Sequence, residues 1–246
     1  MIDVRALTFC LCACLLAVAA CGDGSDATPS PSPTPDFETS AASAAPGVPL
    51  AVGDLTSDWS QAAEGDVGLT QNVDLPEGCN IFDLNVAFPG AFVRASGPAL
   101  RGPEGAQVTS YAAIYRTADD AQHAIDGTRE ILGRCQDDYK SAVEKIADDA
   151  LTALGVNLGF LSSIDVTLDE LPQSTADGSV FYRLEAKVNL PGDDLHYTLD
   201  ATVVRVGRVV AADTYYAAGE GGAPADGDIT AALVRSAADA EGALPR

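Results

Sequence analysis

The chain has 246 residues, of which 47% are hydrophobic and 20% charged, so it is long and apolar enough to build a folded core. Its 36 acidic residues outnumber the 14 basic ones, and the net charge of −22 argues against nucleic acid or anionic lipid head groups as partners. The sequence contains no Gly-x-Ser-x-Gly elbow, His-Glu-x-x-His helix, phosphate loop or dinucleotide fingerprint. We therefore expect a protein that is not an enzyme, with no cofactor, no resident metal and no catalytic residues.

Residues 1–20 have the pattern of a bacterial secretory signal. One basic residue, Arg5, precedes an apolar run that ends in small residues and is too short to span a bilayer. The stretch Val18-Ala19-Ala20-Cys21 resembles a lipobox, in which cleavage before the cysteine leaves its sulfur to carry a lipid. An ordinary signal peptide followed by an unrelated cysteine is the alternative. The pattern predicts Cys21 as a lipid anchor in the outer face of the plasma membrane.

Residues 21–47 have the composition of a disordered stalk. Glycine, proline, serine, threonine and alanine dominate this segment, and few side chains are large enough to repay the entropy of ordering. We expect an extended linker between the lipid anchor and one folded domain at residues 48–246.

The six cysteines fall into two groups. Three lie within the signal and Cys21 is the expected lipid site, which leaves Cys79 and Cys135. An even pair outside the cytoplasm favours a disulfide, which contributes about 4 kcal/mol in the chain-entropy model. Two free or metal-binding thiols are the alternative, although no nearby cysteine or histidine completes a zinc site.

Strand and helix patterns alternate in the first part of the domain. The residues from Phe82 to Val93 predict a strand broken at Pro89-Gly90, and Ala106–Arg116 predicts a second strand. Thr117 is a suitable N-cap for a following helix. The helix has a stripe of inward-facing residues, namely Ala121, Ile125, Thr128, Leu132 and Cys135. A further helical pattern covers 139–154, the residues 155–163 show no clear pattern, and 164–168 is a short candidate strand.

The clearest pattern in the chain is a run of three strands near the C-terminus. Apolar and polar residues alternate over 180–190 and 195–203, with a turn between them, and 208–216 returns after Val206-Gly207. Asp226–Ala243 predicts a last helix that turns Ile229, Leu233 and Ala237 inward. The predicted fold class is α+β: an antiparallel sheet with helices packed on one face and one disulfide.

The polar face of these strands carries the candidate ligand-binding residues Phe181, Arg183 and His196. The simpler interpretation is an exposed sheet face on which opposite charges pair across strands. The alternative is that this face forms the floor of a ligand-binding cleft. In that case, loss of Arg183 and His196 abolishes binding and leaves the melting temperature nearly unchanged.

Three stretches resemble the extracytoplasmic sensor domain of actinobacterial receptor serine/threonine kinases of the PknH type. They are "AAIYRTADDAQHAIDGTREILGRC", which ends in the helix cysteine, "ADGSVFYR", and "VVRVGRVV". Related domains occur as free-standing lipoproteins. This chain departs from the family at Ala176 and Gly178, which replace a glycine and an acid, and at Gly133-Arg134, where a tryptophan is expected. The segment Asp137–Asp169 looks like an insertion.

The resemblance implies a sensor-like domain that binds a ligand in the cell envelope. The ligand expected is a small molecule, a glycan or a lipid, and the membrane is reached through the lipid anchor. Two other functions remain open at this point: an envelope lipid carrier with an apolar cavity, and a module that binds an envelope protein.

Overall fold

The computed structural model of the protein describes residues 36–55, 58–63, 75–81, 83–153, 163–170, 178–190, 193–218 and 227–246. These residues all belong to one unit of the chain, Pro35–Arg246. The predicted signal, the lipobox and the first part of the predicted stalk lie outside the described residues.

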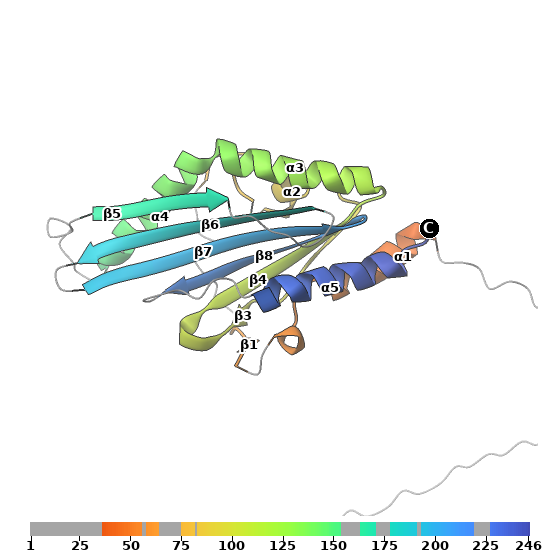
Figure 1. The fold of residues 1–246 in the computed structure, drawn as a ribbon, viewed down its shortest axis with the longest axis horizontal. Coiled ribbons are helices and arrows are strands. Elements are labelled where there is room, and N and C mark those ends of the chain that lie inside the picture. Colours follow the sequence, from red (N-terminus) through yellow and green to blue (C-terminus); the bar gives the residue numbers. More distant parts are fainter. Residues whose placement is uncertain are drawn as a thin grey trace, which may run out of the picture. The chain divides into compact units, whose positions relative to one another are not determined.

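An antiparallel sheet forms the centre of the fold (Figure 1). The strand order is β1-β3-β4-β8-β7-β6-β5, and β2 pairs with β4 beside this path. Three strands are short, namely β1 (Ser60–Gln61), β2 (Val93–Ser96) and β3 (Leu100–Arg101). The longer strands are β4 (Gln107–Ile114), β5 (Ser163–Glu170), β6 (Gly178–Leu190), β7 (Asp193–Val206) and β8 (Val209–Ala218).

The predicted run of three strands is confirmed as β6, β7 and β8, which pair consecutively. Gly207 makes the reversal between β7 and β8 with a φ of 57°, a conformation that glycine adopts without steric cost. Its position is also crowded, because a Cβ here would lie 2.6 Å from Cδ of Glu241. The tight turn therefore requires glycine for two independent reasons.

In the described part of the chain, five helices accompany the sheet: α1 (Phe37–Ala44), α2 (Leu84–Ala87), α3 (Ala118–Arg134), α4 (Gln136–Ala153) and α5 (Gly227–Ala243). Short 3-10 turns follow at Ala45–Gly47, Val52–Asp54 and Pro103–Gly105. The predicted class, α+β with an antiparallel sheet and one disulfide, is confirmed.

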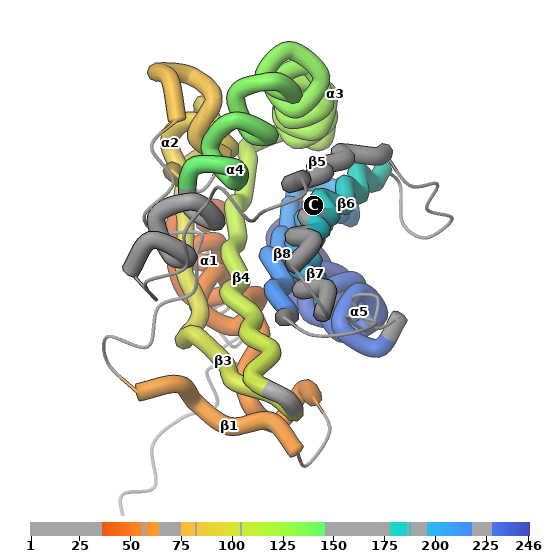
Figure 2. The backbone as a smooth tube through the Cα atoms, turned by 90° about the vertical axis from the view of Figure 1, so that its left-hand side faces the viewer, coloured from red at the N-terminus to blue at the C-terminus, as the bar shows by residue number. Residues whose placement is uncertain are grey.

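The expectation that the helices pack on one face is wrong. The central strand β8 is apolar on both faces: Val209 and Ala211 belong to one core cluster, whereas Val210 and Ala212 belong to another. A strand that is apolar on both faces has to be covered on both. The structure places α5 and α1 on the first face and α3 with α4 on the second, with β6, β7 and β8 between them (Figures 1 and 2). We call these the α5 face and the α3 face.

Helix α3 forms as its sequence predicts. The Thr117 hydroxyl accepts a hydrogen bond from the backbone N–H of Asp120, so Thr117 is the N-cap. The five residues of the predicted stripe are all buried. The helical pattern of 139–154 and the short strand at 164–168 are likewise confirmed as α4 and β5.

The predicted strand at 82–93 is wrong in its first half. Residues 84–87 form the single helical turn α2, because the Asp83 carboxylate caps this turn by accepting a hydrogen bond from the backbone N–H of Asn85. Arg94 bridges the turn by donating to the carbonyl oxygens of its first residue, Leu84, and of its C-cap, Phe88. Only Val93–Ser96 is a strand, β2.

The second part of the predicted stalk belongs to the folded domain. Residues 37–44 form α1, in which Ala41 is 0% exposed and packs in the same core cluster as Leu233 and Ala237 of α5. The Phe37 ring contacts the Phe92 ring, with centroids 5.4 Å apart. Composition alone did not indicate this helix, because it has few large apolar residues. Its alanines can still form a buried contact where two elements approach each other closely.

Arginine side chains complete this contact. The Arg116 guanidinium lies 4.4 Å from the Phe92 centroid and pairs with Glu38 at 2.8 Å, while Arg208 lies 5.5 Å from the Phe37 centroid. Such cation–π contacts each contribute about 0.5–1 kcal/mol at exposed sites. The folded domain therefore begins at Asp36, the N-cap of α1, and not at Val48.

Two neighbouring substitutions test whether α1 is part of the fold. Ala41→Asp places a carboxylate in the core and is expected to destabilise the protein by about 3 kcal/mol, or roughly 10 °C in Tm, because the charge is buried without a partner. Ala42→Asp, on the exposed side of the same turn, should leave the Tm within about 2 °C of the wild type. Equal melting temperatures for the two variants in thermal unfolding would contradict the packing of α1.

Candidate functional site

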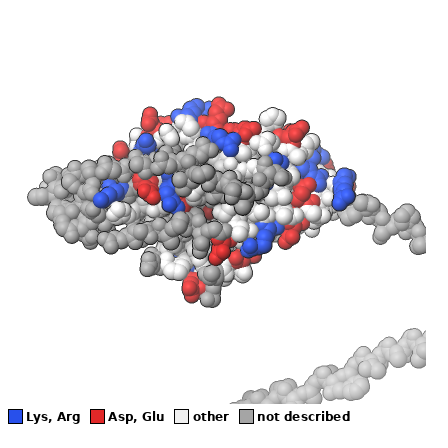
Figure 3. Space-filling model, in the orientation of Figure 1, with Lys and Arg blue, Asp and Glu red and all other residues white. Residues whose placement is uncertain are grey.

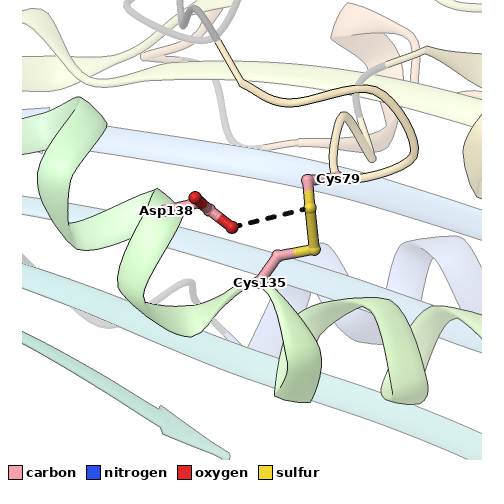
Figure 4. Close-up of side chains that lie close together, drawn as sticks. All are labelled: Cys79, Cys135 and Asp138. Carbon is pink, nitrogen blue, oxygen red and sulfur yellow. Dashed lines mark hydrogen bonds between the residues drawn. A yellow bond between two sulfur atoms is a disulfide. The ribbon is translucent and has the colours of Figure 1, made fainter.

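The two remaining cysteines form a disulfide. Cys79 and Cys135 have their sulfurs 2.02 Å apart and their Cα atoms 5.8 Å apart. The bond joins the loop before α2 to the C-terminal end of α3 (Figure 4). Asp138 lies beside it, with Oδ2 3.8 Å from Sγ of Cys79. Because both sulfurs are bonded to each other, these three residues form a structural cross-link and not the metal site that the free-thiol alternative required.

The predicted ligand-binding residues all lie on the α5 face, but the structure brings only two of them together. Phe181 and Arg183 are neighbours along this face of β6. His196 lies on β7 opposite Lys187, four residues further along β6 than Arg183, which corresponds to about 13 Å. No single small site includes all three residues at once.

Arg183 is already paired within the protein. Its Nε and Nη2 atoms donate to Oδ1 and Oδ2 of Asp200 at 2.8 and 2.7 Å, which is a two-point ion pair between adjacent strands. Hydrogen bonding to Asp200 raises the pKa of Arg183 above its ordinary value. The charges therefore pair across strands, as the simpler interpretation expected, but the surface is not exposed: Asp200 is 0% exposed and Phe181 is 5% exposed.

The opposite face, the α3 face, carries the half-buried tyrosines. Of the seven tyrosines in the chain, Tyr115, Tyr139, Tyr182 and Tyr215 are buried. The other three, Tyr111, Tyr197 and Tyr216, are half-buried and come from three adjacent strands, β4, β7 and β8. Their positions in the strand register place all three on the α3 face.

We call these three tyrosines, with the residues between them, the tyrosine face. Tyr197 and Tyr216 stack with their centroids 6.4 Å apart and their planes 17° apart. Ala201 and Ala212 lie between the aromatic positions, so the floor of this surface is formed by small side chains. Thr109 and Thr214 meet across β4 and β8 with their hydroxyl oxygens 2.5 Å apart.

The tyrosine face is uncharged over its described positions. Besides the residues already named, these positions hold only Gln107 and Leu199. Burial raises the pKa of Tyr216 to about 12, and the neighbouring Tyr197 adds to the rise, so the Tyr216 phenol stays neutral at physiological pH. Elsewhere charge is plentiful: described acidic and basic side chains are interspersed over the face shown in Figure 3. An uncharged aromatic and hydroxyl surface is suited to a neutral polar ligand.

Sequence reasoning missed the tyrosine face because it assigned Tyr197 and Leu199 to the buried side of their strand. A length argument could have found it. The 17 residues of α3 extend about 26 Å, whereas the 14 residues of β7 extend about 46 Å. Helix α3 alone therefore cannot cover the whole α3 face, and α4, whose Tyr139 and Val143 belong to the same core cluster as Tyr111 and Leu199, contributes to the cover.

Comparisons with known proteins give few matches. No family model matches the chain, and no curated protein matches it. Among solved structures, the extracellular domain of PknH from Mycobacterium tuberculosis matches with a TM-score of 0.38 and 6% sequence identity, covering 64% of this chain and 70% of that one. None of the described helices is both long and apolar enough to cross a membrane.

The Arg183–Asp200 pair leads to a prediction that differs from the one made from sequence. Arg183→Met leaves the buried Asp200 carboxylate without its partner and is expected to lower the stability by about 3 kcal/mol, which thermal unfolding detects as a fall of roughly 10 °C. Lys187→Met, on the same face of the same strand, is the matched control and should change the Tm by less than about 3 °C. An unchanged Tm for Arg183→Met would contradict a structural role for the pair.

Proposed function

We infer that the protein is a lipoprotein of the cell envelope whose folded domain is a sensor-like module that binds a neutral, hydroxyl-bearing ligand and catalyses no reaction. The lipid anchor is Cys21, and the ligand class is a glycan. The observation that carries the binding proposal is the tyrosine face, on which every half-buried tyrosine of the chain lies.

The chemistry of this face supports a sugar ligand. Aromatic rings stack on the apolar faces of sugar rings, and the hydroxyls of tyrosine and threonine donate to and accept from sugar hydroxyls. The residues between the rings, Ala201 and Ala212, are small. In a protein with a net charge of −22, an uncharged surface of this kind also avoids repelling a ligand that carries negative charge elsewhere.

The N-terminal sequence supports the anchor, and labelling in cells tests it. The full chain, expressed in bacteria with radioactive palmitate, should incorporate label at Cys21. Cys21→Ala should abolish the label, whereas Cys14→Ala, a cysteine within the signal, should retain it because only the cysteine at the cleavage site is modified. Label that persists in Cys21→Ala would contradict the lipoprotein assignment.

Ligand binding is tested with the full chain in detergent against soluble muropeptides and neutral tetrasaccharides. A ligand present at 100 times its Kd adds about 2.7 kcal/mol, which raises the Tm by roughly 5–10 °C. Tyr197→Ala should weaken binding about tenfold, since an aromatic stack contributes about 1.5 kcal/mol. His196→Ala changes the adjacent residue on the opposite face and should leave the affinity unchanged.

Three outcomes would contradict this proposal. Loss of binding in His196→Ala but not in Tyr197→Ala would place the ligand on the α5 face, with Phe181 and Arg183. Stoichiometric lipid released from the purified protein by organic solvent would indicate a lipid carrier. No thermal shift with any sugar, together with a protein retained after crosslinking in membranes, would indicate a partner-binding module.

A further inference from the structure

The α5 face contains a buried carboxyl group that no contact described so far explains. Asp213 lies in β8 and is 1% exposed, and neither of its oxygens has a hydrogen-bond partner among the residues that the structure describes. Its direct neighbours across the strands are Ser110 on β4 and Thr202 on β7, and both are also buried. A carboxylate without partners in such a place costs several kcal/mol.

Among the residues that the structure describes, the layer above Asp213 supplies no counter-charge. Helix α5 turns Ile229, Leu233 and Ala237 toward the sheet, and these side chains are apolar. Among the strand residues on this face, Arg183 is paired with Asp200, Glu185 is exposed, and Lys187, His196 and the Tyr215 phenol lie further along the strands. The charged groups of α5 and of the N-terminal residues point elsewhere: Asp228, Arg235, Asp239, Asp36 and Asp54 are exposed, Glu241 pairs with Arg208, and Glu38 pairs with Arg116.

Protonation of Asp213 removes the cost of burying a charged carboxylate at this position. Burial raises the pKa of Asp213 to about 8, the negative charge of Asp200 adds to the rise, and the adjacent Thr202 hydroxyl, although outside hydrogen-bond geometry, opposes it. At neutral pH and below, the group is therefore a neutral carboxylic acid. Because the raised pKa belongs to the closed form alone, closure takes up a proton, and each unit of pH between the ordinary pKa of aspartate and about 8 disfavours closure about tenfold.

The Asp213 environment is connected to the N-terminal segment, which we define as residues 36–50. The backbone N–H of Leu50 donates to Oγ of Ser110 at 2.8 Å, and Ser110 is the residue directly opposite Asp213. Close packing fixes this contact, because a Cβ at Gly97 would lie 2.7 Å from the same Oγ atom. Ala41, Ala45 and Val48 of the segment pack with α5 in one core cluster.

We propose that Asp213 is a buried proton-binding site and that its protonation holds α5 and the N-terminal segment closed on the sheet. Loss of the proton leaves a carboxylate that needs water or a cation, which can reach it only when this layer opens. The N-terminal segment is then held closed on the sheet in mild acid and opens more readily in mild alkali. The proposal does not depend on the identity of any other ligand.

Amide hydrogen exchange of the full chain, followed by mass spectrometry from pH 5 to pH 9 and corrected for the intrinsic exchange rate, tests it. Protection of residues 36–50 and 227–243 should fall by up to about tenfold per pH unit between pH 5 and 8 and level off above. Residues 118–134, in α3 on the other face, should not follow this profile. A wild-type profile that is flat with pH would overturn the proposal.

Variants assign the effect to one group. Asp213→Asn keeps the shape of the side chain but cannot ionise, so its profile should be flat; a retained slope would overturn the proposal. Asp239→Asn on the exposed side of α5 and His196→Asn should both keep the wild-type slope. If Asp213→Asn does not fold, Asp213→Ser replaces it, and carbon NMR of the wild-type carboxyl groups measures the titration directly. An Asp213 signal that titrates below pH 5 would overturn the proposal.

Discussion

The fold depends on the burial of both faces of one strand, β8. Successive residues of β8 alternate between two separate cores, with Val209 and Ala211 in one and Val210 and Ala212 in the other. Each core needs a helical layer, and the chain supplies α3 with α4 for one face and α5 with α1 for the other. The small side chains of Ala211 and Ala212 allow the helices to approach the sheet closely. Close packing therefore provides apolar contact even though these side chains are small.

The elements with strong periodic patterns could be predicted from the sequence. The alternation over β6 and β7 and the stripe of α3 have unambiguous periods, and Thr117 and Gly207 mark boundaries with a clear stereochemical reason. The number of covered faces could not be predicted, because β8 reads "VVAADTYYAA", in which neither set of alternating residues is polar throughout. Helix α1 was missed because its composition is that of a linker, and only its contact with α5 reveals its role.

Among the candidate sites, too, some features could be predicted from the sequence and others depend on the strand register. The disulfide was predictable because only two cysteines remained to pair. Phe181 and Arg183 were correctly placed on one face, but sequence could not show that Asp200 would satisfy the arginine, since this depends on the register between β6 and β7. The same limit applies to Asp213, the one acidic residue of β8: its role is visible only when the register shows that its neighbours carry hydroxyl groups and that its cover is apolar.

The first and the last helix of the domain share one layer, and this bears on the order in which the protein is made. The α5 face is only partly covered after β8 has been synthesised, because α5 comes later in the chain and α1 makes the rest of its contacts only when α5 arrives. Ala41 and Leu233 are separated by most of the domain, so their contact closes a long loop and belongs among the slow steps of folding. Until then, Val204, Val209 and Ala211 expose an apolar sheet surface, and this is the interval in which aggregation competes with folding.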